Sequence, residues 1–324
     1  MNKKVSIIVP LYNTVVNLKQ TLDSICNQSY ENLEIIIVVN HIGEKSKNVV
    51  KEYSEKDKRI ITFNYQEKKN SSKLKNIGLR SSTSDYILFV YSNDILEKDA
   101  VLKMMKLMKD NKSDLVQNIP KKIYKKNNKM RFITEDKIPK NNIVGNINND
   151  LRLLTNNCYC DTILIRKKII QDLFFNEDLN KFEDILFYYS IKKRANNCVL
   201  MNNSISKNIM EFNNFLDEDL EYFKVIKLIK KDFDSYDESI KNKIYANLFT
   251  KFILILMIKT NKNDIRLIKE NINKLIIEFK DYKNNIFINK SIKYIVKLYL
   301  NDNKILKIIN SKSLYFVYYS YLIK

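Results

Sequence analysis

The first 120 residues alternate between short apolar runs and segments in which apolar residues recur every three or four positions. The apolar runs, rich in Ile and Val, predict buried strands at 5–10, 33–40, 60–64 and 86–91. The periodic segments between them predict helices at 15–28, 49–57 and 72–80. Strands that alternate with helices indicate an α/β fold, with a mostly parallel sheet covered by helices on both faces.

The rest of the chain is less regular at first and then becomes helical. Residues 121–150 are polar and basic and give no clear pattern, whereas 161–165 predicts a strand. Helices are predicted at 167–173 and 184–194, and from about residue 215 the helical pattern continues to the end. We therefore expect an α/β domain at 1–212 and an all-helical C-terminal region at 213–324.

Short segments that contain polar residues follow three of the predicted strands. They occupy 10–13, 40–43 and 91–94. Carboxyl ends of parallel strands meet at one edge of a sheet, and ligands bind outside that edge. These segments are therefore expected to line one rim.

Composition supports a folded core and excludes several classes of protein. Of 324 residues, 45% are hydrophobic, and only three are Gly, with neither GxGxxG nor GxxxxGK[ST]. The four cysteines are too few for a disulfide scaffold, and one His cannot complete a zinc site around Cys158 and Cys160. We expect reduced thiols. The first apolar run ends at Pro10, so we expect no signal peptide, and no run is long enough to span a bilayer.

The formal net charge of +20 raises the question of a nucleic-acid partner. The charge is concentrated in two places: 112–131 carries six Lys and Arg131 against Asp114, and 283–324 has a net charge of +7. No recognisable nucleic-acid motif accompanies it, and Lys-rich composition is also background from an AT-rich genome. We therefore expect no nucleic-acid partner.

Four motifs occur in a characteristic order. They are Val5-Ser-Ile-Ile-Val-Pro-Leu-Tyr-Asn13, Lys75-Asn-Ile-Gly78, Tyr86-Ile-Leu-Phe-Val-Tyr-Ser-Asn-Asp94, and Phe174-Phe-Asn-Glu-Asp-Leu179 with Phe182-Glu-Asp184. In order and spacing they resemble the family 2 glycosyltransferases with the GT-A fold, and in detail the bacterial enzymes that build surface oligosaccharides and capsules. The resemblance covers roughly 1–212. It implies a nucleotide-sugar half at about 1–120 and an acceptor half at about 121–212.

The resemblance assigns a nucleotide-sugar site to the rim. The family's Pro-x-Tyr-Asn loop, which contacts the base and ribose of the nucleotide in the family, is intact here at Pro10, Tyr12 and Asn13. Asn40 stands where the family has an acidic loop. Lys75 replaces an Arg of the family and keeps its positive charge, and either side chain is suited to face a diphosphate. The residues assigned to this site are Pro10, Tyr12, Asn13, Asn40, Lys75, Arg80, Ser92 and Asn93.

The metal motif departs from the family pattern. Asp-Ser-Asp-Asp is replaced by Tyr91-Ser92-Asn93-Asp94. Paired carboxylates hold the Mg²⁺ or Mn²⁺ that neutralises the leaving diphosphate, and Tyr91 is not a carboxylate. Three outcomes stay open: a weak metal site on Asp94, metal-free stabilisation by Lys75 or Arg80, or no catalysis.

The resemblance also places the catalytic acidic pair at Glu183 and Asp184. In the family, the Asp of this pair is the general base that deprotonates the acceptor hydroxyl, which then inverts the anomeric carbon. The alternative for Asp184 is an acidic helix N-cap, and one residue can serve both purposes.

These observations lead to a functional prediction and a rival. We expect an inverting hexosyltransferase that uses a nucleotide sugar and a glycan or lipid-linked glycan in surface polysaccharide or lipooligosaccharide synthesis. The rival is a catalytically impaired GT-A pseudoenzyme that acts as a binding or partner subunit. We expect a cytoplasmic protein. Its basic, aromatic segment 283–324 either contacts the inner leaflet or forms a helical cap on the catalytic domain.

Overall fold

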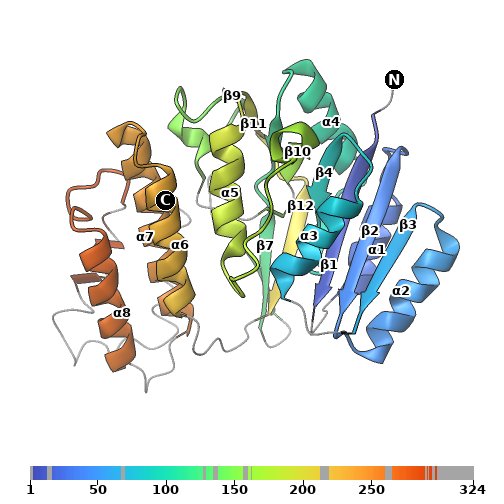
Figure 1. Ribbon diagram of the computed structural model, residues 1–324, viewed down its shortest axis with the longest axis horizontal. Coiled ribbons are helices and arrows are strands. Elements are labelled where there is room, and N and C mark those ends of the chain that lie inside the picture. The colour runs from blue at the N-terminus through green and yellow to red at the C-terminus, as the bar shows by residue number, and fades with distance from the viewer. Residues whose placement is uncertain are drawn as a thin grey trace. The chain divides into compact units, whose positions relative to one another are not determined.

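The computed structural model divides the chain into two compact units. Unit 1 comprises Met1–Leu153 and Asn157–Phe212, and unit 2 comprises Leu154–Asn156 and Asn213–Lys324. The structure describes residues 3–12, 17–66, 70–126, 129–133, 138–155, 160–161, 163–211, 219–259, 265–288, 290, 292–293 and 296–297. Figure 1 shows the helices and strands of both units.

An eight-stranded sheet forms the centre of unit 1, in the order β3-β2-β1-β4-β10-β6-β11-β9. Its strands are β1 (Val5–Tyr12), β2 (Leu33–Asn40), β3 (Ile60–Tyr65), β4 (Tyr86–Phe89), β6 (Leu115–Gln117), β9 (Ile143–Gly145), β10 (Ile163–Arg166) and β11 (Cys198–Leu200). The first four strands of that order are parallel, β10 runs antiparallel to both neighbours, and β9 is antiparallel to β11. The prediction of a mostly parallel sheet is confirmed.

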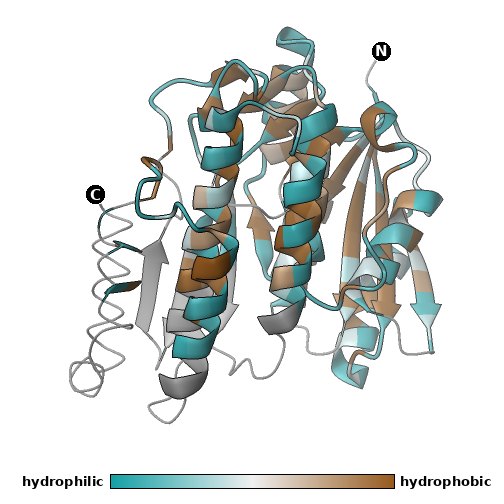
Figure 2. Ribbon diagram, turned by 60° about the vertical axis from the view of Figure 1, so that its left-hand side comes forward, coloured by the Kyte–Doolittle hydropathy of each residue, from teal (hydrophilic) through white to brown (hydrophobic). Residues whose placement is uncertain are grey.

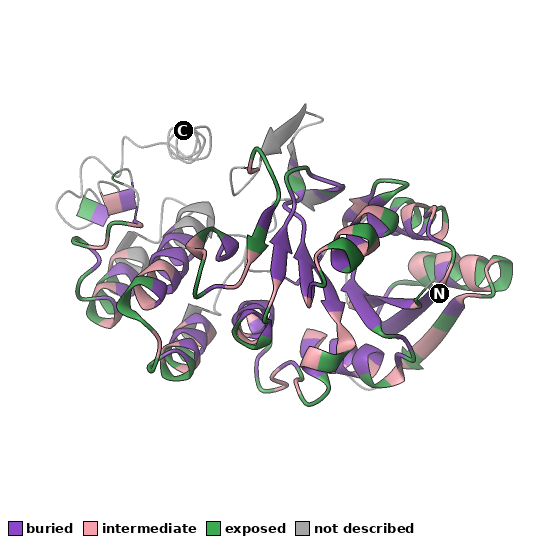
Figure 3. Cartoon of the chain, turned by 90° about the horizontal axis from the view of Figure 1, so that it is seen from above, coloured by how far each residue is buried: buried purple, intermediate pink, exposed green. Residues whose placement is uncertain are grey.

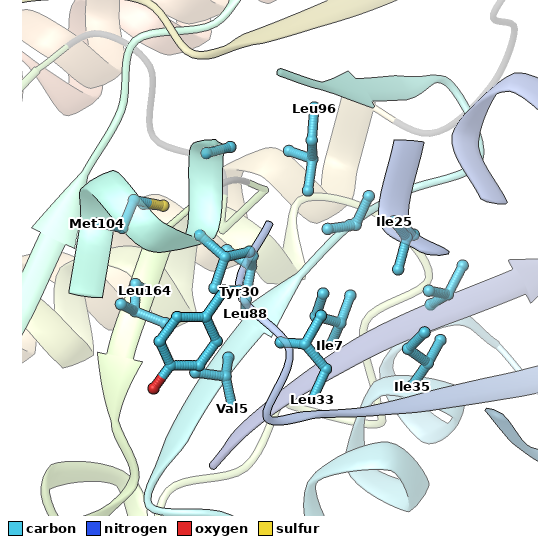
Figure 4. Packing of buried hydrophobic residues seen from close by; sticks show 14 of the residues in the cluster. Val5, Ile7, Ile25, Tyr30, Leu33, Ile35, Leu88, Leu96, Met104 and Leu164 are labelled. Carbon is cyan, nitrogen blue, oxygen red and sulfur yellow. The ribbon is translucent and has the colours of Figure 1, made fainter. Parts of the chain in front are cut away.

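Helices cover both faces of this sheet, as Figure 3 shows by the buried strands between partly exposed helices. Unit 1 contains α1 (Leu18–Cys26), α2 (Glu44–Lys56), α3 (Ser71–Ser81), α4 (Ala100–Asp110) and α5 (Glu183–Arg194), with 3-10 helices η1 (Leu151–Leu153) and η2 (Lys167–Ile170). On one face, alternate residues of β1 pack with apolar residues of α1 and α4. Figure 4 shows this cluster, including Ile7, Ile25 and Met104.

The opposite face of the sheet receives α3 and α5. Gly78 of α3 lies so close to Ile8 of β1 that a Cβ at position 78 would overlap the Ile8 side chain. Phe89 of β4 packs edge-on against Phe187 of α5, with ring centroids 6.3 Å apart. These contacts hold α3 and α5 against the end of β4, where the polar motifs converge.

A second, four-stranded sheet also belongs to unit 1. Its order is β5-β12-β7-β8, formed by β5 (Asp94–Leu96), β12 (Ser206–Glu211), β7 (Lys121–Lys126) and β8 (Lys129–Ile133). In its register Asn208 of β12 lies opposite Asp94 of β5. This sheet therefore connects residue 208 to the motif that follows β4.

Unit 2 is helical in its described residues: α6 (Asp219–Asp232), α7 (Glu238–Lys259) and α8 (Ile265–Glu278). The Tyr222 ring stacks on Phe252, with centroids 4.6 Å apart, and Phe249 stacks on Tyr282 at 5.0 Å. Asn247 donates to the carbonyl groups of Leu154 and Thr155.

Several elements differ from the sequence predictions. Helix α4 and the short strands β5, β6, β9 and β11 had no predicted counterpart, and η2 replaces part of the helix expected at 167–173. The hydrophobic colouring of Figure 2 follows the strands of the sheet, the signal that predicted the longer ones. Cys26, Cys160 and Cys198 are free thiols, and Cys158 lies outside the described residues.

Candidate active site

Four of the singled-out side chains come together on the α3–α5 face of the main sheet. Lys75 comes from α3, Tyr91 from the turn after β4, and Glu183 and Asp184 from the first turn of α5. Lys75, Glu183 and Asp184 are buried, with 1%, 5% and 8% of their surface exposed, and Tyr91 is half-buried. A buried cation beside two buried carboxylates is rare unless the charges pair.

The charges do pair, and the hydrogen bonds are short. Lys75 Nζ lies 2.7 Å from Glu183 Oε1 and 2.9 Å from Asp184 Oδ2. The Tyr91 hydroxyl donates to the other oxygen, Asp184 Oδ1, at 2.5 Å. Each carboxylate oxygen of Asp184 therefore has a partner from a different element.

Aromatic rings and a strained backbone conformation also support the contacts of Lys75 with Glu183 and Asp184. Lys75 Nζ lies 4.9 Å from the ring centroids of both Tyr91 and Phe175, distances typical of cation–π contacts. Phe182, which precedes α5, has φ 63°, a left-handed conformation that is costly for a bulky residue. This conformation starts α5 directly at Glu183 and directs the acidic pair toward Lys75.

Electrostatics favour a charged cluster with a strong base. Burial raises the pKa of Asp184 above its ordinary value, while the Lys75 charge and the Tyr91 hydrogen bond act in the opposite direction. Burial would lower the pKa of Lys75, but the charges of Asp184 and Glu183 outweigh it and raise that pKa. Burial and the neighbouring Asp184 raise the pKa of Tyr91, so its hydroxyl keeps its proton. A buried carboxylate with a raised pKa is a candidate general base, and that role of Asp184 stays a prediction.

The tetrapeptide at the metal-motif position is held by its own hydrogen bonds. Asp94 is fully buried; its Oδ2 accepts from the Tyr91 backbone N–H at 2.8 Å, and its Oδ1 accepts from Asn208 at 2.6 Å. Asn93 donates to Asn208 at 3.2 Å. Within the described part of the chain, no three His, Cys, Asp or Glu residues are grouped to hold a metal ion. Both carboxylate oxygens of Asp94 are therefore engaged by protein donors, and metal binding at Asp94 stays a prediction.

The predicted rim exists at the ends of β1 and β2. Tyr12 lies in register with Asn40, and Asn40 with Tyr65 of β3. The buried Asn40 side chain donates to the Tyr65 carbonyl at 2.9 Å. Pro10 lies two residues before Tyr12 on β1, whereas Asn13 lies outside the described residues. Nucleotide binding by these residues stays a prediction.

Ser92 and Arg80 lie in different surroundings. The Ser92 carbonyl accepts from Thr21 at 2.9 Å, which anchors the turn after β4 to α1. Arg80 lies in the last turn of α3, and its guanidinium stacks on Phe174 at 4.7 Å. The structure brings Lys75, but not Arg80, to the acidic pair.

Sequence reasoning missed two contributors to the site. Asn208 binds both Asn93 and Asp94, yet it lies in a strand that the sequence pattern did not predict. The Cys160 thiol, buried, donates to the backbone carbonyl of Asp184 at 3.5 Å. No local signal marks either residue, because both contacts join segments far apart in sequence.

Comparisons with known proteins identify the family and the fold of the chain. The model of the family described as glycosyl transferase family 2 matches residues 6–174. Glycosyltransferase GlyA of Streptococcus pneumoniae is 36% identical over 115 residues, which are 36% of this chain and 16% of GlyA. The poly(ribitol-phosphate) beta-N-acetylglucosaminyltransferase TarP of Staphylococcus aureus is 32% identical over 142 residues, 39% of this chain and 42% of TarP. The chain thus matches less than half the length of either relative.

The fold comparison covers almost the whole chain. The crystal structure of S. aureus TarS 1–349 in complex with UDP-GlcNAc superposes with a TM-score of 0.72 at 16% sequence identity, covering 98% of this chain and 91% of that one. Such low identity supports the fold alone. With the family match over more than half of its residues, the chain has the GT-A fold and belongs to glycosyl transferase family 2.

Proposed function

We propose that the chain is an inverting glycosyltransferase that moves a sugar from a nucleotide-sugar donor to a glycan acceptor in bacterial surface polysaccharide or lipooligosaccharide synthesis. The observation that carries the proposal is the buried contact of Asp184 with Lys75 and Tyr91 at the end of β4. The matched relatives are glycosyltransferases from bacteria, and none of them favours the pseudoenzyme alternative.

Asp184 acts as the general base in this proposal. Its carboxylate takes the proton of the acceptor hydroxyl as the oxygen attacks the anomeric carbon. The bond between that carbon and the diphosphate oxygen breaks, and its electron pair leaves with the nucleotide diphosphate. Lys75 keeps Asp184 ionised before the reaction, and burial makes the carboxylate more basic than an exposed one. No step runs through a metal ion.

We assign the donor and the acceptor to different parts of the chain. We assign the donor to the part before residue 121, where Tyr12 and Asn40 end neighbouring strands. The acceptor is assigned to about 121–212, the part that contributes Asp184. TarS was crystallised with UDP-GlcNAc, so that nucleotide sugar is the first donor to test.

Contact with the inner leaflet is a further part of the proposal. Among the helices that the structure describes, none is long and apolar enough to cross a bilayer. The net charge of +7 over 283–324 supports adsorption to anionic lipid instead, although residues 298–324 lie outside the described ones. Flotation with anionic and with neutral vesicles tests this: binding to the anionic vesicles alone is expected, and equal recovery from both contradicts it.

Donor turnover tests the proposed function itself. The purified chain is incubated with a panel of nucleotide sugars, with and without Mn²⁺, with water or candidate glycans as acceptor. We expect release of nucleoside diphosphate from at least one donor, and a β-linked product from an α-linked donor by NMR. Retention of the α configuration contradicts the inverting mechanism, and no turnover of any donor contradicts the enzyme assignment.

A further inference from the structure

Tyr91 links the turn after β4 to the proposed base. Its backbone is fixed by Asp94 in both directions: the Tyr91 N–H donates to the Asp94 carboxylate at 2.8 Å, and the Asp94 N–H donates to the Tyr91 carbonyl at 2.9 Å. Its ring lies under the Lys75 ammonium group, and its hydroxyl reaches Asp184 Oδ1 at 2.5 Å. Backbone, ring and hydroxyl are thus all held.

Two contacts from different directions fix the carboxylate plane of Asp184. Lys75 approaches Oδ2 from α3, whereas Tyr91 approaches Oδ1 from the end of β4. Without the Tyr91 hydroxyl, Lys75 would be the remaining partner of the carboxylate among the residues that the structure describes, and the carboxylate would turn more freely about its Cβ–Cγ bond. Rates of proton transfer depend steeply on such orientation.

We propose that Tyr91 is a positioning residue that aims Asp184 at the acceptor hydroxyl and supports its ionised form. This inference rests on the proposed function, because it assumes that Asp184 is the general base. Tyr91 keeps its own proton throughout: the acceptor proton goes to Asp184, and the Tyr91 O–H remains a donor.

A neutral donor suits the local charge balance better than a carboxylate. The titratable groups around Asp184 and the Tyr91 ring come from three segments and are Lys75, Glu183, Cys160 and Asp161. They include one cation, and two carboxylates already share it. A further carboxylate at position 91 would add uncompensated charge, whereas the phenol adds a hydrogen bond without charge.

The test removes only the hydroxyl, in Tyr91→Phe. Its matched control is Tyr53→Phe on α2, which deletes another tyrosine–carboxylate hydrogen bond, to Asp23 of α1. We expect kcat to fall about 10- to 100-fold in Tyr91→Phe, with the donor KM within twofold of wild type. The acidic limb of the kcat profile should move to higher pH, because the lost hydrogen bond favoured the ionised carboxylate. Tyr53→Phe should leave kcat, the donor KM and the acidic limb of the profile unchanged.

A second measurement does not need turnover. Titration of the Asp184 ¹³C carboxyl signal, assigned with Asp184→Asn, should give a higher pKa in Tyr91→Phe than in wild type. Fluorotyrosine at position 91 keeps shape and hydroxyl but donates more strongly, so it should shift the Asp184 titration to lower pH.

The outcomes separate the inference from the proposed function. Wild-type kcat and an unmoved acidic limb in Tyr91→Phe overturn the inference, and a faster Tyr91→Phe shows that Tyr91 obstructs the site, which overturns it too. A wild-type chain that turns over no donor defeats the proposed function instead. The titration still tests the inference if no donor is turned over. An Asp184 pKa that is unchanged in Tyr91→Phe and in the fluorotyrosine variant overturns the positioning role.

Discussion

The ammonium group of Lys75 lies 2.9 Å from a carboxylate oxygen of Asp184, although 109 residues separate them in sequence. The same nitrogen lies 2.7 Å from Glu183. Two buried carboxylates therefore share one buried cation, which ties α3 to α5. This relationship makes Lys75 a structural and an electrostatic partner of the proposed base.

Removing the Lys75 charge should destabilise the fold. In Lys75→Met the two carboxylates lose their buried partner, a loss of about 3–5 kcal/mol in the free energy of unfolding at neutral pH. The folded-state pKa of Asp184 would rise further above that of the unfolded chain, so the loss should shrink as pH falls and this carboxyl protonates. Denaturant unfolding at pH 7 and pH 5 measures this. Lys73→Met, on the same helix but less buried, is the control; equal effects of both variants contradict the account.

Restoring an acidic residue at position 91 should not restore a metal site. Tyr91→Asp adds charge beside the acidic pair, while Asp94 stays engaged by Asn208 and the residue 91 backbone. We expect at least a 10-fold loss of donor turnover, with no recovery in Mn²⁺ and no Mn²⁺ binding by electron paramagnetic resonance. Tight Mn²⁺ binding with recovered turnover would show that the tetrapeptide does accommodate a cation.

Glu34 should give unit 1 an acid-sensitive component of stability. Burial would raise its pKa, but hydrogen bonds from Ser6 and Thr83 and the Lys4 contact outweigh it and lower the pKa to about 2. Because this is below its ordinary value, the contribution is present above about pH 4.5 and is lost as pH falls toward 2. Glu34→Gln should cost about 3 kcal/mol at pH 7. The difference from wild type should vanish near pH 2; a difference independent of pH contradicts the assignment.

The close packing of α3 on β1 predicts the effect of a single methyl group. Gly78→Ala places a Cβ against Ile8, so we expect about 1–3 kcal/mol of destabilisation. Gly43→Ala is the matched control, because nothing lies within 4 Å of its Cβ position and its φ is −67°. Thermal unfolding of both variants measures the contrast, and equal melting temperatures would show that α3 relaxes away from β1.

Much of the fold was visible in the sequence because its signal is local. The run Leu33–Asn40 is buried at every position, so its uniform apolar pattern identified β2 without ambiguity. Strands of three residues, such as β9 and β11, are too short to show a period. Helix α4 was missed although Val101, Met104 and Met108 are buried on one face.

The site was predicted only in part, for a related reason. The order of the motifs identified Asp184 and Lys75 as candidate site residues. It did not show that their side chains are in contact. The resemblance predicts that Lys75 can face a diphosphate, which stays a prediction, and the structure shows a contact that the sequence did not reveal: its ammonium group lies between two carboxylates. That pairing, like the Asn208 contact with Asp94, depends on tertiary packing that spacing along the chain does not encode.

The central claim is that Asp184 is the base, and the turnover of Asp184→Asn tests it most directly. Asp178→Asn is the control, because it makes the same change at an exposed residue close by. With a donor accepted by the wild type, we predict a fall in kcat of about 10²- to 10⁴-fold for Asp184→Asn, with nucleotide affinity by calorimetry retained. Asp178→Asn should match the wild type. Turnover by Asp184→Asn within threefold of wild type would contradict the account.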